Sequence, residues 1–154
     1  MKRLTDKNIG HIQTWINALR NGEYTTVHNQ WIVDDKCGCA VGIGGLATGC
    51  NYLYNRTKVD SIMLQDELSQ KTGLSASHLW VISNMFEGMQ TVTDPLNYYL
   101  TKRWHFKQKS VLEIVDYLQA LIAKEYRLRK KENEVVSNKQ SERSLPFSME
   151  LVRA

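Results

Sequence analysis

The amino-acid sequence predicts a mainly α-helical fold with a minor β-hairpin, a long C-terminal helix and a polar tail. Apolar residues recur every three or four positions in several segments, helix-capping residues precede these segments, and β-prone residues cluster only near residues 24–33. A chain of 154 residues has the length of one domain and can bury a core without a metal or a disulfide. We therefore expect a single helical domain over residues 1–131 and a polar tail with a terminal apolar motif over residues 132–154.

The N-terminal part of the chain predicts a helix followed by the hairpin. Thr5 or Asp6 can cap a helix over residues 5–21, and Asn21-Gly22 supplies a left-handed stop. The apolar face of this helix consists of Ile9, Ile12, Ile16 and Leu19. Two β-prone runs, residues 24–27 and 31–33, flank a polar turn and indicate the hairpin, with residues 34–36 as the loop that follows.

Five further segments predict helices. Residues 39–48 are almost entirely small or apolar and favour a short central helix surrounded by the others. Residues 60–71 and 75–88 each have a capping residue at the start and a glycine at or just beyond the end. Asp94-Pro95 opens a short helix towards Leu100. The longest helix begins at a Ser-x-x-Glu capping box at Ser110 and is expected to end near Lys131.

Composition and charge exclude several classes of protein. The chain has no apolar run long enough to span a membrane, and its polar start argues against a secretory signal. Three cysteines, an odd number, do not make a disulfide framework, so we expect a cytoplasmic protein. The net charge of +4 is uneven. Residues 1–100 carry eight Lys/Arg and nine Asp/Glu, whereas residues 101–154 carry twelve and seven.

The cysteines raise two alternatives, a Cys-dependent enzyme and a zinc site. A thiolate nucleophile needs a lowered pKa and a base within hydrogen-bond reach. The candidate nucleophiles are Cys37 and Cys39. The candidate bases are His28, His78 and His105, and the candidates for orienting the base are Asp34 and Asp35. Zinc would need all three cysteines, including Cys50, together with His28, because paired ligands are lacking. Cysteine is more often a buried small hydrophobe, so we expect Cys39 in the core and predict no catalytic residue, metal or cofactor.

Two motif-like features have simpler explanations. Gly42, Gly44 and Gly45 suggest a phosphate-binding loop, but the Gly-Lys-Ser/Thr of a P-loop is missing, and close packing explains them better. Residues 68–86 form two predicted helices joined by a Gly-containing turn, as in a helix-turn-helix motif. The second of these helices has no Lys or Arg to reach DNA, which argues against that function.

A basic and aromatic segment over residues 98–131 is the candidate binding region. Its candidate contact residues are Lys102, Arg103, Trp104, Lys107, Lys109, Arg127, Arg129, Lys130 and Lys131, and Lys124 could extend the same surface. Interleaved aromatics and cations can stack bases and neutralise phosphates. The simpler interpretation is that the aromatics anchor a connector to the core while the cations face water. The terminal apolar motif adds three further candidates for partner binding, Leu145, Phe147 and Leu151.

Three sequence blocks resemble those of a known group of proteins. The blocks are Trp15-Ile-Asn-Ala-Leu-Arg-Asn-Gly-Glu-Tyr24, Cys39-Ala-Val-Gly42 and Ser110-Val-Leu-Glu-Ile-Val-Asp-Tyr-Leu118. Their order resembles an uncharacterised family of small bacteriophage and bacterial proteins with W-x-x-A-L-R-x-G-x-Y, C-[CA]-x-G and E-I-x-D-Y-[LI] blocks. The resemblance covers residues 12–122. Ala40 stands where many members carry a second cysteine, and residues 89–109 look like an insertion. The family implies a phage or bacterial origin and supplies no catalytic residues.

The expected function is therefore binding and not catalysis. The sequence and the resemblance favour a non-enzymatic, phage-type accessory protein that binds a host macromolecule in the host cytoplasm and inhibits a host process or defence. A host protein is the favoured partner, and a membrane is not expected. Nucleic-acid binding through residues 98–131 is the first alternative, and a Cys-dependent enzyme is the second. The oligomeric state stays open.

Overall fold

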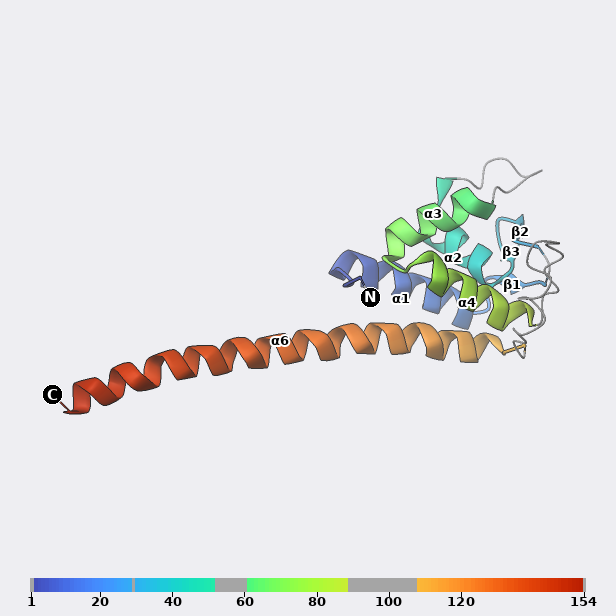
Figure 1. The fold of residues 1–154 in the computed structure, drawn as a ribbon. Coiled ribbons are helices and arrows are strands. Elements are labelled where there is room, and N and C mark those ends of the chain that lie inside the picture. Colours follow the sequence, from blue (N-terminus) through green and yellow to red (C-terminus); the bar gives the residue numbers. More distant parts are fainter. Residues whose placement is uncertain (1, 29, 52–60, 89–107, 154) are drawn as a thin grey trace, which may run out of the picture. The chain divides into compact units, whose positions relative to one another are not determined.

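The computed structural model describes residues 2–28, 30–51, 61–88 and 108–153, without the side chains of Ser61 and of residues 142–153. These residues form five helices and a three-stranded sheet, so the expected mainly α-helical class with a minor β component is confirmed (Figure 1). In chain order the elements are α1 (Asp6–Arg20), β1 (Thr25–Thr26), β2 (Ile32–Asp34), β3 (Cys37–Gly38), α2 (Ala40–Thr48), α3 (Ser61–Thr72), α4 (Ala76–Glu87) and α6 (Val111–Arg153). The helix expected from Asp94 lies outside the described residues. Two compact units, Met1–Gln119 and Ala120–Ala154, divide the chain within α6.

α1 begins and ends as the sequence predicts. Thr5 is the N-cap, and its hydroxyl accepts a hydrogen bond from the backbone N–H of Asn8 at 3.1 Å. The Asn8 side chain accepts one from the Thr5 N–H at 3.0 Å, which completes a capping box. At the other end, Gly22 has a φ of 68°. Trp15 is fully buried, and its indole N–H donates to the carbonyl oxygen of Ala40 at 2.9 Å, so α1 is held against the first residue of α2.

α2 is the central helix of the first unit. It contacts α1, α3, α4 and β3, and residues 40–45 are all buried (Figure 1). A Cβ at Gly44 would lie 2.6 Å from the Trp15 ring, and one at Gly42 would overlap the carbonyl oxygen of Trp31. These glycines therefore allow other parts of the chain to approach the helix closely. The close-packing interpretation of the glycine cluster is confirmed.

The small sheet differs from the expected hairpin in its strand pairing. The strand order is β1-β3-β2, with β1 parallel and β2 antiparallel to β3, so the two predicted strands are not neighbours. Of residues 34–36, expected as the loop after the hairpin, Asp34 ends β2 and residues 35–36 form the turn to β3. Asp34 Oδ1 accepts a hydrogen bond from the Lys36 N–H in this turn at 2.8 Å. The expected pairing of residues 24–27 with residues 31–33 was wrong because the strand between them in the sheet contains a glycine, and glycine is depleted in strands. The pair Cys37–Gly38 therefore gave no strand signal, and the flanking runs had only each other as apparent partners.

The C-terminal end of α3 and both ends of α4 agree with the prediction, whereas the expected capping residue of α3, Asp60, lies outside the described residues. Gly73, with a φ of 69°, follows α3, and Gly88, with a φ of 76°, ends α4. Ser75 caps α4 in a reciprocal box with His78. The fully or almost fully buried apolar side chains of these helices are Leu64, Leu68, Leu79, Ile82 and Phe86. Leu79, Ile82 and Phe86 are spaced by three and four residues, so they lie on one face of α4, which is its core face.

α6 begins at the predicted capping box but does not end at Lys131. The Ser110 N–H donates to Glu113 Oε2 at 2.7 Å, and the Glu113 N–H donates to Ser110 Oγ at 3.3 Å. The helix then continues to Arg153, so the expected end was wrong. Low apolar content had indicated a tail, yet Glu, Lys, Gln and Arg are good helix formers and can propagate a helix that has already been nucleated. Within the described residues, no helix combines the length and apolar composition needed to cross a bilayer.

Candidate interaction surface on the C-terminal helix

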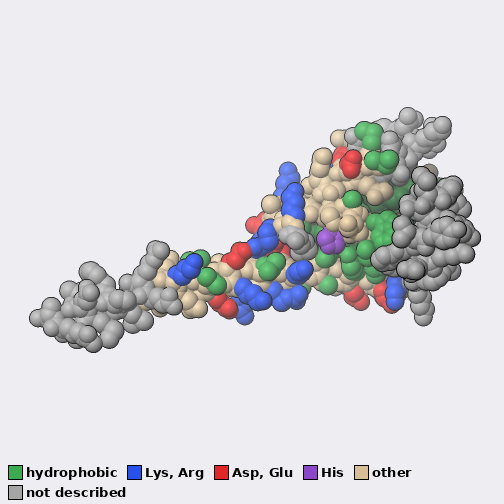
Figure 2. All heavy atoms as spheres, viewed as in Figure 1, with side chains coloured by type: hydrophobic (Ala, Val, Ile, Leu, Met, Phe, Trp, Pro, Cys, Tyr) green, Lys and Arg blue, Asp and Glu red, His purple; other side chains and the backbone are tan. Residues whose placement is uncertain are grey.

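Four cationic side chains lie on one side of α6 in the second unit. Lys124, Arg127 and Lys131 follow the spacing i, i+3 and i+7, which places them on one helix face, and Lys130 comes three residues after Arg127. All four are exposed, and none forms an ion pair within the described part of the chain. At 1.5 Å per residue they span roughly 10 Å of the helix axis. We call these four residues the basic face; Figure 2 shows Lys and Arg side chains gathered along α6.

Arg129 differs from its cationic neighbours because it has partners. Its Nε lies 3.4 Å from Oε2 of Glu125, one turn earlier on the helix, and the Glu125 side chain is only 1% exposed. The guanidinium carbon of Arg129 also lies 5.6 Å from the centre of the Tyr126 ring. A carboxylate therefore balances the charge of Arg129, and we do not include this residue in the basic face.

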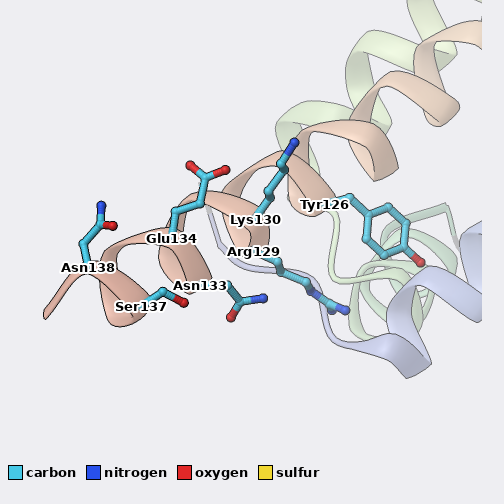
Figure 3. A pocket seen from close by; sticks show the side chains of 7 residues that line it. All are labelled: Tyr126, Arg129, Lys130, Asn133, Glu134, Ser137 and Asn138. Atoms are coloured by element: carbon cyan, nitrogen blue, oxygen red, sulfur yellow. The ribbon is translucent and has the colours of Figure 1, made fainter. Parts of the chain in front are cut away.

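Polar side chains border the basic face in a shallow hollow of about 740 Å³. The hollow is lined by Tyr126, Arg129, Lys130, Asn133, Glu134, Ser137 and Asn138 (Figure 3). All seven come from α6, so among the described residues the hollow is an open helix face without a second wall. Enzyme pockets usually enclose most of a ligand and exclude water. This surface is suited to contact with a large partner and not to enclosing a small substrate.

The structure brings together only part of the binding set predicted from the sequence. Arg127, Lys130 and Lys131 share the basic face, whereas Lys109 lies in the first unit with its Nζ 4.0 Å from Glu113 Oε1. The predicted contact residues Lys102, Arg103, Trp104 and Lys107 lie outside the described residues. The apolar candidates Leu145, Phe147 and Leu151 fall within α6, but their side chains are outside the description.

The polar residues of the hollow were missed by the sequence analysis. Tyr126, Asn133 and Ser137 are spaced by seven and four residues, which places them on one helix face. The sequence analysis expected the helix to end at Lys131, so Asn133 and Ser137 were not expected to share a helix face with Tyr126. The signal was present in the sequence but depended on the length of the helix.

Cys39 is a buried helix-capping residue with a structural role. It is the N-cap of α2, where its Sγ accepts a hydrogen bond from the Gly42 N–H at 3.3 Å, and it is 4% exposed. Burial raises the pKa of its thiol to about 11, and the negative charge of Glu87 adds to this shift. The thiol therefore stays protonated at neutral pH, whereas a nucleophile requires the thiolate. Burial also raises the pKa of Cys50, and Cys37 is half-buried.

His28 has a carboxylate partner that the sequence analysis did not identify. Its Nδ1 lies 3.3 Å from Oε2 of Glu87, whose side chain is 5% exposed. Within the described residues, His28 forms no ion pair with Asp34 or Asp35, the candidate orienting residues of the enzyme hypothesis. The His28 ring stacks on Phe86 with 4.4 Å between centroids, and the Gln108 amide nitrogen lies 2.8 Å from His28 Nε2. The cluster joins three segments of the first unit. Within the described residues, no three His, Cys, Asp or Glu side chains group closely enough to hold a metal ion.

The other candidate bases are placed differently. His78 belongs to the capping box of α4, where its Nδ1 lies 2.8 Å from the Ser75 hydroxyl. His105 lies outside the described residues. Within the described residues, no cysteine sulfur forms a hydrogen bond with a histidine ring.

Comparisons of the chain with models of protein families, with curated proteins and with solved structures give no match. The resemblance to small phage and bacterial proteins therefore stays a prediction.

Proposed function

We propose that this chain is a non-enzymatic accessory protein of phage type, which binds a host macromolecule through α6 and so inhibits a host process or defence. The observation that carries the proposal is the exposed basic face, whose four cations have no ion-pair partner in the described part of the chain. The phage origin and the inhibitory role are supported by the resemblance of the sequence blocks alone.

The exposure of α6 supports binding as its role. Residues 131–141 are all exposed, and Val135 and Val136 are 51% and 53% exposed. Helices in proteins owe most of their stability to packing of one face against other elements. A partner that covers this part of α6 would bury side chains that the described chain leaves in water.

Site-specific photo-crosslinking in bacterial cells tests this proposal. Asn138→benzoylphenylalanine places the crosslinker on α6, and Gln13→benzoylphenylalanine places it on the exposed side of α1 as a matched control. We expect the α6 variant to form covalent adducts with a host protein or nucleic acid, and the α1 variant to form none. Equal adducts from both positions, or none from α6, would contradict the proposal.

A further inference from the structure

Within the part of α6 whose side chains are described, no carboxylate forms an ion pair with the basic face. Glu134 comes four residues after Lys130, but the two side chains form no ion pair within 4 Å in the described structure. Glu125 faces Arg129 instead. Like charges three or four residues apart repel each other and destabilise a helix. An extended anion placed along this face would remove that repulsion, so its charge pattern is complementary to a polyanion.

Most of the side chains beside the basic face are of the types that proteins use to contact phosphates. The hollow is lined by the hydroxyl and amide side chains of Tyr126, Asn133, Ser137 and Asn138, by the cations Arg129 and Lys130, and by one carboxylate, Glu134 (Figure 3). Contacts to the DNA backbone come from Lys and Arg and from the hydroxyl and amide groups of Ser, Asn and Tyr. The centre of a protein–protein interface is instead apolar and depleted of charge. The observed mixture therefore favours a phosphate backbone over an acidic protein surface.

The shape of the surface favours a duplex over a single strand. Proteins hold single strands mainly by stacking bases on several exposed aromatic rings. On this part of α6 the aromatic side chain is Tyr126, and its ring is already contacted by Arg129. A helix about 10–12 Å across fits the major groove of B-DNA, which is about 12 Å wide, whereas the major groove of double-stranded RNA is too narrow.

We infer that the basic face of α6 is a binding site for the phosphate backbone of double-stranded DNA. The inference rests on the proposed function and names the class of macromolecule that α6 recognises. Lys124, Arg127, Lys130 and Lys131 neutralise phosphates, and the neighbouring hydroxyl and amide groups donate hydrogen bonds to them. These are backbone contacts, so the binding depends strongly on salt and little on base sequence.

Fluorescence anisotropy with the full-length protein tests this inference. The probe is a fluorescein-labelled DNA duplex of mixed sequence, titrated over a series of salt concentrations. We expect log Kd to rise linearly with log salt, with a slope of about 0.9 for each phosphate neutralised. Each of Lys124→Ala, Arg127→Ala, Lys130→Ala and Lys131→Ala should lower the slope by about one and weaken binding to all sequences alike.

Lys36→Ala is the matched control, because it removes one exposed cation from the first unit and should leave the slope unchanged. Far-UV circular dichroism checks that every variant keeps its helices. No binding to the duplex at the lowest salt overturns the inference, as does an equal loss of slope in Lys36→Ala. Tighter binding to labelled single-stranded RNA or to poly-glutamate also overturns it. If the duplex fails while the Asn138 crosslinker captures a host protein, the proposed function stands and the DNA inference alone is wrong.

Discussion

Cys39 shows how two opposing effects on one side chain are resolved. The N-terminus of a helix is positive and stabilises a thiolate, and the Gly42 N–H donates directly to this sulfur. Removal of the sulfur from water acts in the opposite direction and is larger, so the pKa rises to about 11. Burial therefore decides the protonation state of Cys39, and the cap uses the neutral thiol as its acceptor.

The stability of the protein should fall at alkaline pH because of this thiol. In the unfolded chain Cys39 ionises near its usual pKa of 9.0, whereas in the folded protein it stays protonated up to about 11. The contribution is fully present below about pH 9 and is lost as the pH rises through about 11, a change on the order of 2 kcal/mol. Urea unfolding at several pH values measures it. Cys39→Ser, which keeps a capping oxygen, should show a smaller loss; an equal loss in both proteins would contradict this explanation.

The glycines of α2 allow a matched test of packing. Gly44→Ala places a Cβ 2.6 Å from the Trp15 ring, and such overpacking destabilises a core by roughly 1–3 kcal/mol. Gly10→Ala in α1 is the control, because nothing lies within 4 Å of its Cβ, and it should stabilise the helix by roughly 0.5–1 kcal/mol. The free energy of unfolding in urea should therefore change in opposite directions. A neutral Gly44→Ala would show that the indole can move aside.

The distal part of α6 should give helical signals in solution. The helix passes through residues 132–141 without a break, although none of them is buried. We expect the Cα chemical shifts of these residues to lie downfield of random-coil values, like those of Ala40–Thr48. The loop over residues 21–24 supplies a non-helical reference within the same protein. Random-coil shifts throughout residues 132–141 would restore the interpretation of this segment as a tail.

At the level of elements, the sequence predicted the helix caps correctly but not the pairing of the strands. The caps at Thr5, Ser75 and Ser110 involve residues three positions apart, so a short stretch of sequence contains all the information they need. The strand Cys37–Gly38 forms only because other strands lie on both sides of it. The end of α6 was missed for another reason: a polar composition is typical of tails and of exposed helices alike.

At the scale of the whole molecule, removal of the distal part of α6 should leave the stability almost unchanged. A stop after Lys131 removes no described side chain that is buried, so we expect the free energy of unfolding to change by less than about 0.5 kcal/mol. Leu118→Ala is the contrasting variant, since this fully buried side chain should contribute roughly 2–5 kcal/mol. Urea denaturation followed by tryptophan fluorescence measures both. A large loss on truncation would mean that the distal helix packs on other parts of the chain.

In the candidate site, the sequence predicted the cationic residues and their spacing along the helix, but not which side chains are buried. Clustered cations identified Arg127, Lys130 and Lys131, and the i, i+4 spacing of Glu125 and Arg129 is also visible in the sequence. The burial of Glu125 is not visible there, and that burial separates Arg129 from its neighbours. The contact between His28 and Glu87 joins residues far apart in the chain, so only the fold could reveal it.

The pairing of Arg129 with Glu125 has an electrical consequence for the helix. One cation is balanced while the four of the basic face are not, so the centre of positive charge lies off the helix axis. The segment therefore has a dipole moment across its axis, in addition to the backbone dipole that runs along it. In the field of an extended polyanion the transverse moment exerts a torque, which turns the basic face towards the opposite charge before contact. For the proposed DNA partner, the pairing of Arg129 with Glu125 therefore favours an approach in which the basic face leads.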